Sequence, residues 1–175
     1  MPPTRHRAAV LTVSDLGSRG ERVDTAGPAV VSLLAGAGFE VAEQVLLPDE
    51  PEQIAALLRR WADEGEIVLV VTTGGTGLAP RDRTPEATQA VLDYRVPGME
   101  EAMRAASVAM VPTAMLSRAV CGVRGRTLIV NLPGSERGAR ENLTTLLSVL
   151  GHACSSLRGD AEESASTHGR IQGQP

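Results

Sequence analysis

Residues 67–88 are I-V-L-V-V-T-T-G-G-T-G-L-A-P-R-D-R-T-P-E-A-T, and the fold class follows from their order. Five apolar residues, most of them β-branched, are typical of a strand that is buried on both faces. A turn with three glycines and a charged loop come next. Thr84-Pro85-Glu86 then has the features of a helix start, with a hydroxyl N-cap, an early proline and an acid. In an open α/β sheet, a loop at this position binds ligands.

The segments around this loop alternate between strand and helix patterns. The expected strands are 8–13, 39–47, 67–73, 114–123 and 126–130, of which the last two form a β-hairpin. The expected helices are 28–37, one that opens at 47–52 and contains Trp61, 85–93, 98–110 and one from 135 to about 157. This alternation predicts an α/β fold, a three-layer α/β/α sandwich with a mostly parallel sheet and one β-hairpin. Residues 16–28 are expected to form an exposed polar loop.

Length and apolar content predict one domain over residues 8–157, between flexible tails at 1–7 and 158–175. No apolar run approaches the ~20 residues of a membrane helix, and the N-terminus has no secretory h-region. We therefore expect a cytoplasmic protein without a membrane partner. The methionines at 99, 103 and 110 repeat at helical spacing, which indicates a core face.

All 17 basic residues are arginine, and the net charge is −4. The absence of lysine excludes Schiff-base chemistry and lysine-dependent phosphate loops. Three aromatic residues and an acidic balance argue against a nucleic-acid partner. Cys121 and Cys154 are interpreted as buried thiols, and the scattered histidines form no cluster for a soft metal.

Polar residues follow three of the expected strands, at Ser14-Asp15, at residues 72–84 and at residues 131–135. Parallel strands bring their carboxyl ends to one edge of a sheet, so these segments are expected to meet there. The glycines at 74, 75 and 77 allow backbone N–H groups to approach an anion closely, although a tight turn alone would also explain them. The loop is neither a Walker A loop nor G-x-G-x-x-G.

Acidic residues near this edge have two interpretations. Asp49, with Glu52 three residues later, fits a helix cap on local sequence alone. Asp82 lies beside a loop suited to phosphate, where an acid repels the ligand unless a cation such as Mg²⁺ mediates. Asp15 and Asp24 are further candidates, or turn residues.

Three polar residues later in the chain are also ambiguous. Ser117 and Arg118 are either exposed strand residues or part of the same cleft. Asn131 follows an apolar run, so its side chain needs a partner, which is either a turn backbone or a ligand. Ser135 is expected to cap the last helix.

Two long motifs resemble one known family. Residues 72–88 and L-S-R-A-V-C-G-V-R-G-R-T-L-I-V-N-L-P-G-S at 116–135 are similar to the molybdopterin adenylyltransferases, the MogA/MoaB-type proteins and the matching domains of gephyrin and the plant Cnx protein. L-T-V-S-D at 11–15, D-T-A-G-P at 24–28 and L-P-D-E at 47–50 match in the same order. The resemblance covers residues 8–157 and implies this family's α/β fold.

The resemblance implies an enzyme of molybdenum cofactor biosynthesis that transfers AMP from Mg-ATP to molybdopterin and releases pyrophosphate. Asp49 and Asp82 match the family's essential acids and are the expected catalytic residues and ligands of Mg²⁺. The residues expected to bind substrate or nucleotide are Ser14, Asp15, Thr73, Gly74, Gly75, Thr76, Gly77, Thr84, Ser117, Arg118, Asn131, Pro133, Gly134 and Ser135. The expected assembly is a homotrimer, with a hexamer as the alternative, and the expected partners are other molybdenum cofactor biosynthesis proteins.

One alternative is a member of the same family that has no catalytic activity. Some such domains bind molybdopterin, or act as scaffolds, without catalysing a reaction. The intact pair Asp49 and Asp82 argues against this alternative, because a pure binder has no use for two acids beside phosphates. The sequence leaves open whether the cofactor made later in the pathway contains molybdenum or tungsten.

Overall fold

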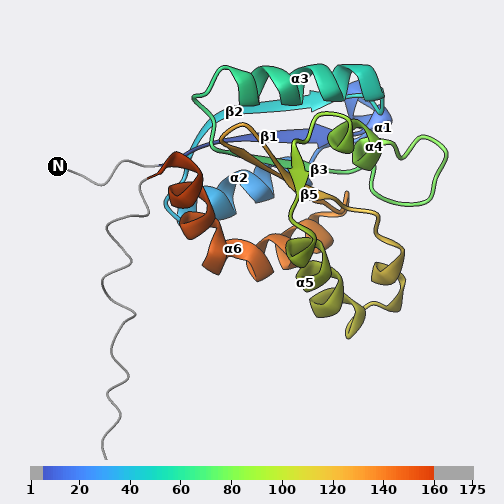
Figure 1. The fold of residues 1–175 in the computed structure, drawn as a ribbon. Helices are drawn as coiled ribbons and strands as arrows, with labels where there is room; N and C mark the ends of the chain where they lie inside the picture. Colours follow the sequence, from blue (N-terminus) through green and yellow to red (C-terminus); the bar gives the residue numbers. More distant parts are fainter. Residues whose placement is uncertain (1–5, 160–175) are drawn as a thin grey trace, which may run out of the picture.

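A computed structural model describes residues 6–159 and contains one six-stranded sheet between two layers of helices (Figure 1). The strands are β1 (Arg7–Val13), β2 (Glu40–Leu47), β3 (Leu69–Thr73), β4 (Tyr94–Arg95), β5 (Cys121–Arg124) and β6 (Thr127–Leu132). Their spatial order is β2-β1-β3-β6-β5-β4. The first four strands in this order are parallel, and β5 and β4 continue the sheet in antiparallel pairing. The predicted α/β sandwich with a mostly parallel sheet is confirmed.

The helices are α1 (Asp15–Ser18), α2 (Ala26–Gly36), α3 (Pro51–Asp63), α4 (Thr84–Gln89), α5 (Pro97–Val108), the 3₁₀ helix η1 (Pro112–Leu116) and α6 (Glu136–Arg158). Helices α3 and α4 cover one face of the sheet, and α2, α5 and α6 cover the other (Figure 1). Within the described residues, no helix is both long enough and apolar enough to cross a membrane.

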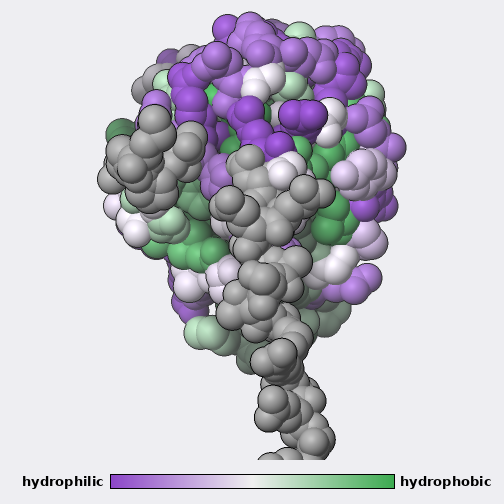
Figure 2. Space-filling view, turned by 60° about the vertical axis from the view of Figure 1, so that its left-hand side comes forward, coloured by the Kyte–Doolittle hydropathy of each residue, from purple (hydrophilic) through white to green (hydrophobic). Residues whose placement is uncertain are grey.

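The central strands face two cores because their side chains alternate between the faces of the sheet. Val10 and Val71 pack with Leu143 of α6 in one core, while Leu11 and Val70 pack with α3 in the other. All of these side chains are buried, which is why the strands have almost no polar residues before their carboxyl ends. The outer face of α3 is hydrophilic, as the top of the molecule in Figure 2 shows.

Several expected elements differ in extent. The predicted strand at 114–123 is wrong in its first half, where Pro112 begins η1 and only Cys121–Arg124 pairs with β6. The hairpin itself is confirmed, with a left-handed φ of 56° at Gly125 in its turn. The expected loop after β1 contains the short helix α1, which Ser14 caps by accepting the Gly17 N–H at 3.0 Å.

Local capping was predicted less well than the elements themselves. The N-cap of α3 is Glu50 and not Asp49, and the N-cap of α4 is Arg83 and not Thr84. Ser135 caps α6 as expected, by accepting the Gly138 N–H at 3.1 Å. The methionine face of α5 is core only in part: Met99 and Met103 are buried, while Met110 lies beyond the helix and is 64% exposed.

The ends of the domain extend slightly beyond the expected limits. Arg7 is the first residue of β1, and α6 continues to Arg158. The rest of the predicted flexible tails, residues 1–5 and 160–175, lies outside the described residues.

Candidate active site

Four parallel strands end side by side, and the loops that follow them form the candidate site. The register pairs Val13 with Leu47, Thr12 with Thr73, and Thr73 with Leu132, so the carboxyl ends of β1, β2, β3 and β6 are level. The three expected polar segments therefore meet at one edge, and the loop after β2 joins them.

The glycine-rich loop approaches its neighbours so closely that side chains would not fit. Gly74 and Gly75 have left-handed φ values of 103° and 65°. A Cβ atom on Gly75 would overlap the Thr84 hydroxyl and lie 2.9 Å from Oδ1 of Asp49, and a Cβ atom on Gly77 would lie 2.8 Å from Oδ2 of Asp82. The glycines thus leave room for the two acids.

Two cavities meet at this loop. The first, which we call the α5 cavity, has a volume of about 440 Å³ and lies among the glycine loop, α5, η1 and the start of α6. The second, the acid cavity, has a volume of about 510 Å³ and lies among the loops after β1, β2, β3 and β6. Four residues line both cavities: Gly75, Asp82, Gly134 and Ser135.

Most of the predicted site residues line one of these cavities. Those in the acid cavity alone are Ser14, Asp15, Asp49, Thr73 and Gly74. Those in the α5 cavity alone are Thr76, Gly77, Ser117 and Pro133. The structure therefore brings together residues that are up to 121 positions apart (135 − 14).

Three predicted residues line neither cavity, and we correct their placement. Asn131 is fully buried: its Oδ1 accepts the Val120 N–H, and its Nδ2 donates to the hydroxyls of Thr72 and Thr88. Its partners are therefore neither a ligand nor a turn backbone, but three neighbouring segments: the residue before β5, strand β3 and helix α4. Thr84 is also buried, and its hydroxyl has no hydrogen-bond partner among the described residues.

Arg118 is the third of these residues, and its guanidinium is used to hold the glycine loop. Nε donates to the Gly77 carbonyl at 2.8 Å, Nη2 to the Asp82 carbonyl at 2.5 Å, and Nη1 contacts Glu86. Its backbone N–H donates to the Thr76 carbonyl. Arg118 therefore shapes the loop from outside the cavities.

Asp49 is the most confined acid of the site, with 9% of its surface exposed. Its Oδ2 accepts the Asp15 N–H at 2.9 Å, whereas Oδ1 lies beside Gly75. Burial raises the pKa of Asp49, and the negative charges of Asp15 and Asp82 raise it further. The interpretation of Asp49 as a helix cap is wrong, and its carboxylate is available to the cavity.

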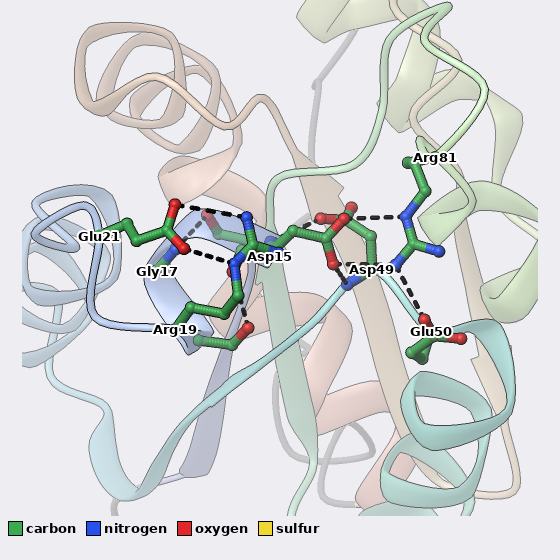
Figure 3. A network of polar contacts seen from close by, with 9 residues as sticks. Asp15, Gly17, Arg19, Glu21, Asp49, Glu50 and Arg81 are labelled. Atoms are coloured by element: carbon green, nitrogen blue, oxygen red, sulfur yellow. Dashed lines mark hydrogen bonds and ion pairs between the residues drawn. The ribbon is translucent and has the colours of Figure 1, made fainter.

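Asp15 has the opposite environment, although it lies next to Asp49 (Figure 3). Arg81 donates from Nε and Nη2 to its two carboxylate oxygens at 2.8 and 2.9 Å. These bonds, together with one from the Asp49 N–H, lower the pKa of Asp15 to about 2. Arg81 also donates to Glu50 at 2.8 Å.

Asp49 and Asp82 have the donor chemistry that a hard cation requires. Asp82 accepts only the Ala79 N–H, at 3.0 Å, and neither acid has an arginine partner among residues 6–159. The described part of the chain groups no three metal-binding side chains. Two carboxylates whose oxygens still have free lone pairs fit Mg²⁺, because this ion keeps bound water molecules and takes substrate phosphates as its other ligands.

Sequence reasoning missed several residues of the α5 cavity. Ser107 and Asn142 come from α5 and α6, are nearly buried, and are joined by a hydrogen bond of 3.1 Å from Nδ2 to Oγ. Arg104 and Arg137 line the same cavity. The sequence contains one feature that could have identified them. Asn142 is a polar residue next to Leu143, on the side of the helix that faces the core.

Comparison with known proteins identifies the family. The family model described as "Probable molybdopterin binding domain" matches residues 9–152. The molybdopterin adenylyltransferase of Escherichia coli K12 is 44% identical over 140 residues, which cover 78% of this chain and 71% of the relative. The molybdenum cofactor synthesis protein cinnamon of Drosophila melanogaster is 39% identical over 166 residues, 94% of this chain.

A solved structure agrees with these matches. The molybdopterin biosynthesis enzyme MoaB of Thermus thermophilus superimposes with a TM-score of 0.84 at 57% identity, covering 88% of this chain and 97% of that one. The chain spans 28%, 23% and 49% of the lengths of cinnamon and two other curated relatives. The predicted resemblance is confirmed, and the chain belongs to the molybdopterin-binding-domain family of molybdenum cofactor biosynthesis proteins.

Proposed function

We propose that this chain is a molybdopterin adenylyltransferase that transfers AMP from ATP to the terminal phosphate of molybdopterin. The observation that carries the proposal is the shared wall of the two cavities, formed by Gly75, Asp82, Gly134 and Ser135. A reaction between two substrates needs adjoining sites that hold the reacting atoms in line. The names of the relatives support the same activity.

The reaction requires two things of the protein: that it positions the substrates and that it neutralises the charge of their phosphates. A terminal phosphate oxygen of molybdopterin attacks the α-phosphorus of ATP, the bond to the β-phosphate oxygen breaks, and pyrophosphate leaves. The nucleophile is already ionised, so no general base is required. The difficulty is the approach of two polyanions, which N–H donors of the glycine loop and the Ser135 end of α6 relieve.

Asp49, in the acid cavity, and Asp82, in the wall that the two cavities share, would hold Mg²⁺. The ion, when bound, neutralises charge on the phosphates of ATP. Hydrogen bonds from the backbone orient the two carboxylates. Asp49 accepts the Asp15 N–H, and Asp82 accepts the Ala79 N–H. Each therefore presents at least one oxygen in a fixed direction.

The same proposal includes the assembly and its setting. The resemblance implies a homotrimer, and the exposed apolar side chains of Met110, Met115 and Leu116 form the kind of surface that a subunit contact covers. Light scattering of the purified chain would test the trimer against a monomer or hexamer. A cytoplasmic location and work beside other molybdenum cofactor biosynthesis proteins complete the proposal.

The deciding experiment incubates the chain with ATP, Mg²⁺ and molybdopterin and measures pyrophosphate together with the mass of the adenylylated product. Asp49→Asn and Asp82→Asn should each lower the rate by about 10²–10³-fold. Asp63→Asn is the matched control, because Asp63 pairs with Arg124 and lines neither cavity. Molybdopterin binding without pyrophosphate would instead establish a non-catalytic member of the family.

A further inference from the structure

Arg81 connects loops that follow three neighbouring strands of the sheet. It lies after β3, and its guanidinium contacts Asp15 after β1 and Glu50 after β2 (Figure 3). These strands are adjacent in the order β2-β1-β3. The contact with Asp15 is bidentate, at 2.8 and 2.9 Å, which is the geometry that arginine makes best with a carboxylate.

The contact continues from Asp15 to Asp49. Oδ1 of Asp15 accepts both Nη2 of Arg81, at 2.9 Å, and the Asp49 N–H, at 3.0 Å. The Asp15 N–H in turn donates to Oδ2 of Asp49 at 2.9 Å. An arginine that holds the Asp15 carboxylate therefore also holds the backbone and the carboxylate of Asp49, without touching Asp49 itself.

Arg81 also compensates the negative charge of one acid in the acid cavity. Four aspartates line the acid cavity. Asp24 accepts the Thr12 hydroxyl and the Gly27 N–H, and Asp15 is paired with Arg81. Asp24, Asp49 and Asp82 have no basic partner among the described residues, so Asp15 is the one aspartate of the four that Arg81 compensates. The pairing thus gives Asp15 a structural role and leaves the carboxylates of Asp49 and Asp82 without an arginine.

We propose that Arg81 is a positioning residue for AMP transfer, which acts through Asp15 to orient Asp49. The inference rests on the proposed function. It differs from a direct role of Arg81 in binding phosphate, because Nε and Nη2 of the guanidinium are engaged by two carboxylates and Arg81 lines neither cavity. A positioning role makes Arg81 and Asp15 one unit, whereas phosphate binding would leave them independent.

The test compares Arg81→Gln, Asp15→Asn and the double variant with the wild type. Each single change should lower kcat by about 10–100-fold and leave the KM for ATP nearly unchanged. The double variant should lose no more than the larger single loss, because the two residues act as one unit. Arg81→Lys should recover part of kcat, since an ammonium keeps the charge but not the bidentate contact.

Arg19→Gln is the matched control. The Arg19 side chain is 55% exposed against 56% for Arg81, and its ion pair is with Glu21 instead of a cavity acid. It should retain wild-type kcat. A raised KM for ATP at unchanged kcat in Arg81→Gln, or losses that multiply in the double variant, would overturn the proposal in favour of direct phosphate binding.

Hydrogen exchange provides a readout that needs no substrate. The amide protons of Asp15 and Asp49 should exchange faster in Arg81→Gln than in the wild type, and Arg19→Gln should leave them unchanged. Unchanged exchange in Arg81→Gln would contradict the inference whether or not the chain transfers AMP. Absent pyrophosphate with wild-type protein would contradict only the proposed function.

Discussion

Asp15 and Asp49 each donate a backbone N–H to the carboxylate of the other, over 2.9 and 3.0 Å. The exchange joins the loops after β1 and β2, but it also places two acids side by side. Arg81 compensates Asp15 and lowers its pKa to about 2, whereas burial raises the pKa of Asp49. One acid of the pair therefore stabilises the fold, and the other carries a charge at a cost to stability.

Asp49→Asn should make the protein more stable while it removes most of the AMP transfer. A carboxylate whose pKa is raised in the folded state destabilises that state at neutral pH, and asparagine removes the charge while it keeps an oxygen for the Asp15 N–H. We expect Tm to rise by about 2–4 °C at pH 7.5, measured by calorimetry. Asp15→Asn should lower Tm, and a lower Tm for Asp49→Asn would contradict this account.

The Arg81–Asp15 pair should contribute to stability in a defined pH range. The pKa of Asp15 falls on folding from 3.8 to about 2, so its contribution is complete above pH 4 and is lost as the pH falls from 4 to 2. In urea unfolding between pH 2 and 5, Arg81→Gln should lose less stability on acidification than the wild type. Arg126→Gln should follow the wild-type curve, because Arg126 makes no ion pair within residues 6–159. Equal acid slopes for all three proteins would refute the assignment.

Gly75→Ala should be more damaging than Gly20→Ala, although both glycines have left-handed φ values, 65° and 73°. Alanine in that conformation costs about 1–2 kcal/mol at either position. At Gly20 the new methyl group meets nothing within 4 Å, whereas at Gly75 it overlaps Thr84 and crowds Asp49. We expect about 1–3 kcal/mol of additional destabilisation and loss of AMP transfer only for Gly75→Ala, measured by urea unfolding and pyrophosphate release.

An equal loss of stability in the two variants, with activity kept in both, would show that the glycine is needed only for the turn. A role in the turn alone is the simpler interpretation of this glycine from the sequence. The close approach of Gly75 to Asp49 favours a role in the site instead.

The sheet and the position of the site could be predicted because both follow from patterns within single segments. The apolar run before Thr72 indicates a buried parallel strand, and level carboxyl ends then bring the polar segments together. On local sequence alone Asp49 fits a helix cap, because its actual partner, the Asp15 N–H, is 34 residues away. Local sequence contains no information on such a contact.

The same limit applies to Asn131 and Arg118. The sequence left the partner of Asn131 open between a turn backbone and a ligand, and it left Arg118 open between an exposed strand residue and a part of the cleft. In the structure, those partners are Thr72 and Thr88 for Asn131, and the glycine loop for Arg118. A motif identifies which residues belong to the site, but only the three-dimensional contacts separate those that line it from those that hold it.

This distinction can be tested at Arg118, for which the chain contains a close match in Arg124. Arg118 contacts the Gly77 and Asp82 carbonyls and Glu86, and Arg124 contacts Asp63 twice and the Val91 carbonyl. The two side chains are 34% and 27% exposed. Arg118→Gln and Arg124→Gln should therefore have similar costs, about 1–3 kcal/mol each in urea unfolding.

The two variants should differ in activity. Arg118 fixes the loop that presents Asp82, so Arg118→Gln should lower the initial rate of pyrophosphate release by about 10–100-fold, as expected when a supporting contact is lost. Arg124 contacts Asp63 and Val91, neither of which lines a cavity, so its variant should keep the wild-type rate. If Arg118→Gln were as active as Arg124→Gln, the shape of the glycine loop would not depend on this arginine, because matched losses of stability would then have no specific effect on the site.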